Sequence, residues 1–247
     1  MRDTLVTMQP HILTYPQVDS EKYAKARYHY LLQIVYGETI AIDYCRIMST
    51  FAPTSEARDF LLQQQKEEDT HLELLTNYVG NHLRTDALVS SHLRKLDALM
   101  SLAIETKDYV KCVFIQNFIV EGLNISLLQE LEHHTDGVLS EISTAILRDE
   151  IRHMEFGVTE IQKILQEDTG GEIRKKLIRL QRKVLFHATL LSMDLARESK
   201  DLGIPMSELS KKTLEAHMKR ISRAHFTLPF IDKLLLRGVL LFLKLYN

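Results

Sequence analysis

Three segments of the chain carry a glutamate followed three residues later by a histidine. They are Glu68/His71, Glu130/His133 and Glu150/His153. On a helix, residues three apart share a face, so a carboxylate oxygen and an imidazole nitrogen can both reach one metal ion. Chance placement of 19 glutamates and 11 histidines in 247 residues gives roughly 0.8 such pairs, so the pairs alone are weak evidence.

Two further glutamates interrupt apolar helix faces. Around Glu38 and Glu121, the positions at steps of three and four are apolar: Leu31, Ile34, Ala41, Cys45 and Met48 for the first, and Phe114, Phe118, Ile125 and Leu128 for the second. Burying a carboxylate without a partner costs several kcal/mol. No lysine or arginine lies within one helical turn of Glu38 or Glu121, so a local salt bridge cannot supply that partner.

The spacing of these acids is regular. Glu38 precedes Glu68 by 30 residues and Glu121 precedes Glu150 by 29, which predicts two helical hairpins of similar length. Four carboxylates and two histidines suit two iron ions, or manganese, bridged by carboxylates. The predicted ligands are Glu38, Glu68, His71, Glu121, Glu150 and His153. The alternative is a polar core whose members satisfy one another without metal.

Neighbouring acids compete for these roles. Glu67 also shares a face with His71, but Glu68 is favoured because it mirrors Glu150. Asp149 is a candidate to accept a hydrogen bond from a ligand imidazole, and the alternative is a surface acid paired with an adjacent arginine.

The third acid–histidine pair, Glu130/His133, serves as an internal control. Glu130 lies nine residues past Glu121, about 180° around the helix, and in a polar helix end. We therefore expect this pair in solvent.

The protein is predicted to be nearly all helix. It has only 9 glycines and 5 prolines, and no convincing alternating strand pattern. Helices are expected at about 18–50, 54–80, 86–105, 108–132 and 138–166, and then at 171–200, 206–225 and 229–246. The simplest organisation is one all-α domain over 1–247, with a metal-site bundle at about 18–167 and extra helices at about 171–246.

Composition excludes several classes of function. The net charge of -2 and the absence of a basic run argue against nucleic acid as a partner. The N-terminal residues lack the apolar core of a signal peptide, and no run of 18 uncharged apolar residues occurs. Two cysteines do not make a disulfide framework. The expected location is the cytoplasm.

Three segments resemble one family. "GETIAID" (37–43), "CVFIQNFIVE" (112–121) and "RDEIRHMEFG" (148–157) are similar to the metal-site helices of cyanobacterial-type aldehyde-deformylating oxygenases, within the ferritin-like di-iron carboxylate superfamily. The resemblance implies a ferritin-like four-helix bundle with additional C-terminal helices, and it carries the family's glutamine near the metals over to Gln116. The family's tyrosine seven residues past the first ligand is not matched: Cys45 stands there, and Tyr44, beside it, is a second candidate near the site.

The same resemblance implies an activity. A long-chain fatty aldehyde would be converted to an alkane one carbon shorter plus formate, with O₂ and electrons from a ferredoxin-type donor. The residues Leu31, Ile34, Phe114 and Phe118 are candidates for the walls of a substrate channel, and equally for ordinary core. Alternatives are a related di-iron oxygenase acting on another substrate, and a ferritin-like iron-storage protein.

The C-terminal segment 229–247 is unusually apolar. Its stretch "LLLRGVLLFLKLY" is too short and too charged to span a bilayer. We expect it to pack on the bundle, and peripheral contact with a membrane surface is the alternative.

Overall fold

The computed structural model describes residues 20–80, 89–135, 137–236 and 238, and these residues form helices and connecting turns without any strand. In chain order the elements are α1 (Ser20–Ser49), α2 (Ser55–Val79), α3 (Ser91–Glu105), α4 (Tyr109–Val113), the π-helix η3 (Phe114–Val120), α5 (Glu121–His134), α6 (Gly137–Glu167), α7 (Glu172–Asp194), α8 (Ala196–Asp201) and α9 (Met206–Arg223). A short helical segment follows at 230–236. The predicted all-α fold with added C-terminal helices is confirmed.

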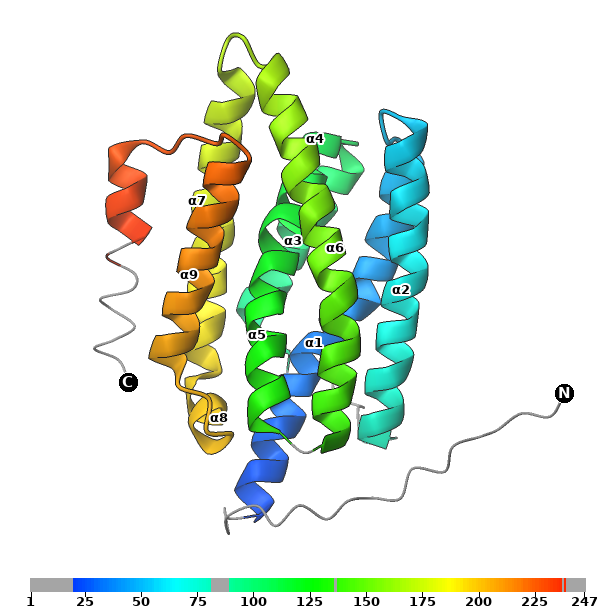
Figure 1. The fold of residues 1–247 in the computed structure, drawn as a ribbon, viewed down its shortest axis with the longest axis vertical. Helices are drawn as coiled ribbons and strands as arrows, with labels where there is room; N and C mark the ends of the chain where they lie inside the picture. The colour runs from blue at the N-terminus through cyan, green and yellow to red at the C-terminus, as the bar shows by residue number, and fades with distance from the viewer. Residues whose placement is uncertain (1–19, 81–88, 136, 237, 239–247) are drawn as a thin grey trace, which may run out of the picture.

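Two antiparallel hairpins build the bundle (Figure 1). The first pairs α1 with α2, and the second pairs the continuous helical stretch α4–η3–α5 with α6. Local signals set the ends of α2: the Thr54 hydroxyl accepts the amide of Ala57 at 3.1 Å, and Gly80 ends the helix with a φ of 67°. Pro53 stands in the turn between α1 and α2, as the sequence predicted.

The second hairpin contains a π-helical segment that the sequence analysis did not anticipate. In η3 the amide of Glu121 donates to the carbonyl of Gln116, five residues back, where an α-helix would use four. The stretch Tyr109–His134 is apolar enough to cross a membrane by length and composition, yet most of its apolar window is buried inside the protein. Its apolar character therefore serves the core.

Two apolar cores lie along the bundle, separated by a polar layer. One core contains Leu31, Ile34, Leu75, Leu128 and Ile146. The other contains Met48, Leu61, Phe118, Met154 and Val158. The predicted metal ligands fall between these two sets on every helix, so the bundle interrupts its apolar filling at one level.

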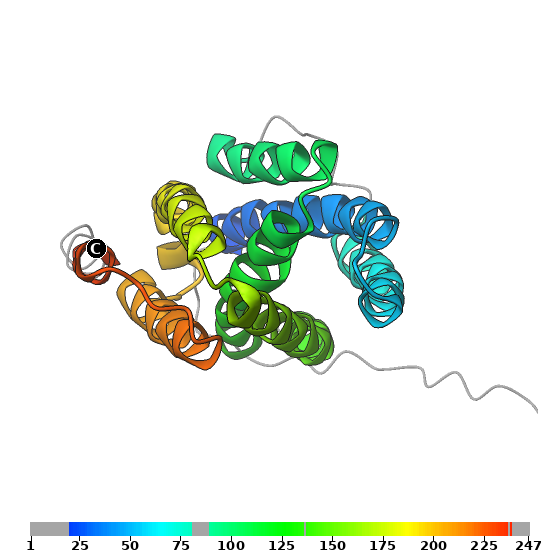
Figure 2. The ribbon, with the colours of Figure 1, turned by 90° about the horizontal axis from the view of Figure 1, so that it is seen from above.

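The remaining helices pack around the bundle (Figure 2). α3 packs on α1 and α7, α8 contacts α1, and α9 packs on α5. The predicted helix 171–200 is wrong in one respect, because the chain turns at Leu195 and forms two helices, α7 and α8. The starts of the first and third predicted helices, and residues 239–247, lie outside the described residues.

Candidate metal centre

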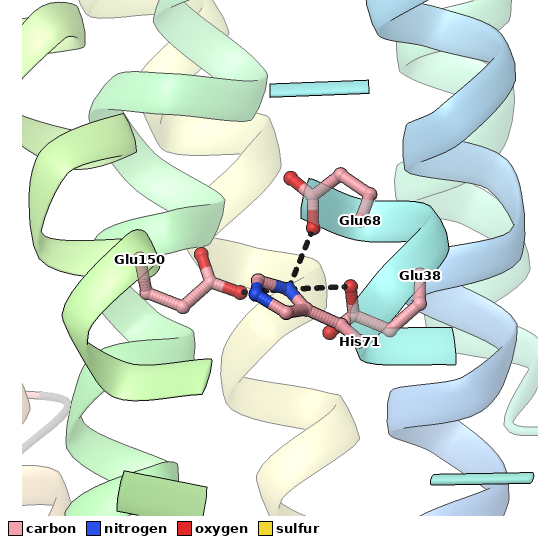
Figure 3. A group of neighbouring side chains, drawn as sticks. All are labelled: Glu38, Glu68, His71 and Glu150. Carbon is pink, nitrogen blue, oxygen red and sulfur yellow. Dashed lines mark hydrogen bonds and ion pairs between the residues drawn. The ribbon is translucent and has the colours of Figure 1, made fainter. Parts of the chain in front are cut away.

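Four helices bring the six predicted ligands to one level of the bundle. The side chains of Glu38, Glu68, His71, Glu121, Glu150 and His153 are all buried. His71 Nδ1 lies 3.2 Å from Glu68 Oε2, 3.5 Å from Glu38 Oε2 and 3.9 Å from Glu150 Oε1 (Figure 3). His153 Nδ1 lies 3.3 Å from Glu68 Oε1 and 3.5 Å from Glu150 Oε2.

These side chains divide into two ligand groups, within each of which the donor atoms lie within 4.8 Å of one another. One group is Glu38, Glu68, His71 and Glu150, and the other is Glu68, Glu121, Glu150 and His153. Glu68 and Glu150 belong to both groups, as bridging carboxylates would. Two donors held about 2.1 Å from one metal lie about 3.0–3.5 Å apart, close to the separations seen here.

Acids next to the paired glutamates cross the bundle to hold the opposite histidine. Asp149 on α6 lies 3.2 Å from His71 Nε2 of α2. Glu67 on α2 lies 2.9 Å from His153 Nε2 of α6. Arg152 contacts both acids, at 3.0 Å from Asp149 and 2.6 Å from Glu67. With Nε2–H donated outward, each Nδ1 presents its lone pair to the cluster.

Glu67, considered above only as a rival ligand, therefore has a role of its own outside the cluster. Asp149 makes both the imidazole contact and the arginine contact that the sequence left as alternatives.

Three buried amide side chains and the partly buried Asn124 surround the carboxylates. Gln64 donates to Glu68 Oε1 and to Glu121 Oε1, each at 2.9 Å. Gln116 donates to Glu121 Oε1 at 2.8 Å, because the π-turn brings residues five apart onto one face. Asn117 donates to Gln64 Oε1 at 2.7 Å, and Asn124 donates to Glu150 Oε1 at 3.0 Å.

Of these four amides the sequence singled out only Gln116, through the resemblance. Gln64 had a readable signal, because it lies on the same buried stripe of α2 as Leu61, Glu68 and His71.

The buried carboxylates of this cluster repel one another, and cations would relieve this repulsion. Burial, followed by repulsion from neighbouring carboxylates, raises the pKa of Glu38, Glu121 and Glu150 well above the usual range. Burial opposes the charge of His71, yet contact with Glu68 and Glu150 raises its pKa. Buried Glu150 Oε2 and His153 Nδ1 have no hydrogen-bond partner within the described residues. The donor set is suited to two metal ions, which would satisfy these atoms.

Tyr44 and Cys45, the two residues of α1 considered as neighbours of the site, point to different parts of the protein. The Tyr44 hydroxyl donates to Asp97 of α3 and lies 3.1 Å from Ser101 Oγ, so it is bound toward α3. Cys45 is fully buried, and burial together with the cluster glutamates raises the pKa of its thiol. Of these two side chains, Cys45 is the one whose pKa is raised by the charge of the cluster.

A cavity of about 640 Å³ adjoins the carboxylates. Its lining includes Glu38, Glu68, Glu121, Glu150 and Gln116, and otherwise mostly apolar side chains of α1, α7 and α9. Ile34 is among the lining residues. Leu31, Phe114 and Phe118 are not among them and lie in the two apolar cores, the alternative that the sequence left open for these residues.

A hydrogen-bond chain runs from this cavity to the backbone beside the cluster. Arg220 donates to the carbonyl of Gly122 at 3.2 Å and to His217 Nδ1 at 3.3 Å. His217 Nε2 lies 3.3 Å from Gln181 Oε1, and both His217 and Gln181 line the cavity. Because Nδ1 accepts from arginine, the proton of His217 resides on Nε2 and is donated to Gln181.

One expectation about the third acid–histidine pair is wrong. Glu130 is buried, and its carboxylate forms ion pairs with Lys212 Nζ of α9 at 2.6 Å and with His134 Nε2 at 3.4 Å. His133 is exposed, so this pair is split between interior and solvent and holds no common site. Helix α9 packs over α5 and covers Glu130, and this packing could not be predicted from the residues of the pair.

Comparison with known proteins establishes the fold. No family model matches the sequence, and no curated protein sequence matches it. A Synechococcus protein with aldehyde deformylating oxidase activity superposes with a TM-score of 0.77 at 17% identity, covering 92% of this chain and 99% of that chain.

Two R2-like ligand-binding oxidase variants also superpose. A variant with an aerobically reconstituted Mn/Fe cofactor has a TM-score of 0.72 at 17% identity, covering 85% of this chain and 83% of its own. A variant with an anaerobically reconstituted Mn/Fe cofactor has a TM-score of 0.71 at 18% identity, with coverages of 85% and 82%. This chain therefore has the ferritin-like helical bundle of these oxidases.

Proposed function

We propose that the protein is a di-metal oxygenase that converts a long-chain fatty aldehyde to an alkane one carbon shorter and formate. The observation that carries the proposal is the apolar cavity, of about 640 Å³, whose floor is the carboxylate cluster itself. That size is typical of small-molecule sites, which are usually 300–1,000 Å³. An iron-storage site needs no such apolar chamber.

The residues of the chain divide the work. Glu38, Glu68, His71, Glu121, Glu150 and His153 would hold two iron ions, or an iron and a manganese ion, which when bound supply O₂ chemistry. Asp149 and Glu67 hold the imidazoles in one tautomer. Gln64 and Gln116 hold one oxygen of Glu121 and so leave fewer orientations to that carboxylate.

The cavity binds and desolvates the substrate chain. Apolar side chains such as Ile34, Leu185 and Leu214 line it, so an alkyl chain gains hydrophobic free energy on entering. Balancing aldehyde plus O₂ against alkane, formic acid and water requires four electrons and four protons. We therefore propose an external one-electron donor of the ferredoxin type.

The test is product analysis on metal-loaded protein. We expect two metal ions per chain, and alkane with an equal amount of formate when saturated aldehydes, O₂ and a reductant are supplied. Glu121→Ala is expected to lose one metal ion and the activity. A hydroxylated product would contradict deformylation and assign a related oxygenase, while an iron mineral core without organic product would assign storage.

A cavity variant tests the substrate class. Ala188 lines the cavity from α7, so Ala188→Phe is expected to shift the preferred aldehyde toward shorter chains without lowering metal content. Ala145→Phe is the matched control, because Ala145 is exposed on α6 and does not line the cavity. An unchanged chain-length preference in Ala188→Phe would contradict substrate binding in this cavity.

A further inference from the structure

The helical segment 230–236 buries its acid and exposes most of its apolar side chains. Four large apolar side chains are exposed, with Phe230 at 79% of its full exposure, and Ile231, Leu234 and Leu235 at about half. Its acid, Asp232, is 2% exposed and accepts two hydrogen bonds from Arg182 of α7, at 2.6 and 2.9 Å. Leu236 alone of its apolar side chains packs against the core, so the ion pair is the main polar contact of the segment, and the four exposed apolar side chains remain uncovered in the described structure.

Exposed cations lie on the segment itself and on α7 next to Arg182, the residue that binds the segment. Arg179, Lys183 and the exposed Phe186 lie on one face of α7, at steps of four and three. Lys233 is exposed on the segment itself. Within the part of the chain that the structure describes, Arg179, Lys183 and Lys233 contact no acid. Figures 1 and 2 place the segment at the outer edge of the molecule, beside α7 and α9.

The cavity reaches the same place. Its lining includes Phe186, Leu235 and Leu236, together with the Arg182–Asp232 ion pair. Since Phe186 and Leu235 are also exposed, the apolar interior is continuous with the apolar surface at the segment 230–236. A substrate leaving an apolar phase could pass along these side chains without crossing water.

We propose that this face binds an anionic lipid surface and takes the apolar substrate from it. The docking surface consists of Phe186, Phe230, Ile231, Leu234 and Leu235, flanked by Arg179, Lys183 and Lys233. Apolar side chains rimmed by cations are the pattern of interfacial binding, in which burial and attraction to anionic headgroups add. The delivery of substrate rests on the proposed function, whereas lipid binding does not.

A second copy of the chain fits this face less well. A two-fold interface places the same patch on both sides, so the cations of one copy would face the cations of the other. An anionic lipid surface instead carries the opposite charge and therefore complements the cations of this face.

The experiment is sedimentation with vesicles, using the full chain both metal-free and metal-loaded. We expect binding to vesicles of phosphatidylglycerol and phosphatidylcholine, weakened by salt, and little binding to phosphatidylcholine alone. Phe230→Ser with Leu234→Ser is expected to weaken binding at least tenfold. Arg179→Gln with Lys183→Gln is expected to weaken it about 25-fold, because each cation near an anionic surface contributes about a fivefold factor.

Matched variants elsewhere keep the test specific. Leu102→Ser with Val138→Ser removes other exposed apolar side chains, from α3 and α6, and Lys66→Gln with Arg148→Gln removes exposed cations from α2 and α6. These controls should bind vesicles like the unaltered protein. Equal weakening by the control pairs, no binding to anionic vesicles, or a concentration-dependent dimer abolished by Phe230→Ser would each overturn the proposal.

The readout separates this proposal from the proposed function. Vesicle binding by protein that makes no alkane would contradict only the enzymatic proposal. Alkane formation at the same rate from dispersed and vesicle-bound aldehyde, without vesicle binding, would contradict only the lipid surface.

Discussion

At the scale of residues, the cluster is organised by acids that reach across the bundle. Each of the two acid–histidine pairs in the cluster is directly preceded by another acid, and each of these preceding acids contacts the histidine of the opposite hairpin. This exchange ties α2 to α6 and fixes which ring nitrogen of each histidine faces the cluster.

The crossed acids make a direct prediction. Glu67→Gln and Asp149→Asn keep the shape of the side chain but remove the charge that stabilises the Nε2–H of the ligand histidine. We expect each to weaken metal affinity about 10–100-fold, measured by competition titration with a chromophoric chelator. Glu73→Gln on the exposed face of α2 is the control and should leave affinity unchanged. Unchanged affinity in both crossed-acid variants would contradict this role.

His217 makes a prediction about pH. Burial, reinforced by the charge of Arg220, lowers its pKa to about 3. In the unfolded chain the pKa is about 6.5, so between these values unfolding takes up a proton. The contribution of neutral His217 to stability is therefore full above about pH 6.5, and is lost as pH falls toward 3.

The measurement is the free energy of unfolding against pH for metal-free protein. We expect His217→Gln to reduce the slope by up to about 1.4 kcal/mol per pH unit below pH 6.5. His133→Gln, which changes an exposed histidine, should leave the slope as it is. An identical slope in the unaltered protein and His217→Gln would show that His217 is protonated in the fold.

The sequence predicted the cluster residues whose type is unusual for their position, and it missed those whose type is ordinary there. A glutamate on an apolar stripe, as at Glu38 or Glu121, is costly without a partner and so attracts notice. Gln64 shares its buried stripe with Glu68, but Gln64 and Asn124 carry no charge, and an uncharged amide on a helix face is ordinary. Their role depends on which carboxylate faces them across the bundle, which the chain does not state locally.

At the scale of elements, the π-helix η3 sets the register of the second hairpin. The segment Phe114–Val120 is uniformly apolar apart from its two amides, and this pattern predicts an α-helix equally well. Only Gly157 signals the unusual packing, because α6 approaches η3 there with no room for a side chain. A Cβ at Gly157 would lie 2.6 Å from the Asn117 backbone and 2.7 Å from the Phe118 amide nitrogen.

This close approach predicts opposite effects for two glycine substitutions. Gly157→Ala must displace backbone, so we expect a loss of about 1–3 kcal/mol in the free energy of unfolding, together with weaker metal binding. Gly37→Ala on α1 meets nothing within 4 Å and should stabilise the helix by about 0.5–1 kcal/mol. Denaturant titration of both variants is the measurement. Equal stability of the two variants would argue against tight packing of α6 on η3.

At the scale of the whole molecule, the bundle was predictable and its covering was not. Paired hairpins follow from the spacing of the acids, because each hairpin must return its chain to the same level. How α7, α9 and the segment 230–236 enclose a cavity depends on contacts far apart in sequence. Reading apolar residues as inward-facing failed for most of 230–236, where the one acid is buried and four of the five large apolar side chains are exposed.

The ion pair that holds this segment gives the last prediction. Arg182 lowers the pKa of Asp232, so the pair stabilises the segment above the ordinary carboxyl pKa and is lost as pH falls through the lowered value. Asp232→Asn should therefore release 230–236 and speed chymotrypsin cleavage after Phe230, while the melting temperature of the bundle changes little. Asp43→Asn, which breaks the exposed pair with Arg46, is the control and should not alter cleavage. A bundle that melts earlier with unchanged cleavage would mean that Asp232 supports the core instead of tethering the segment at the mouth of the cavity.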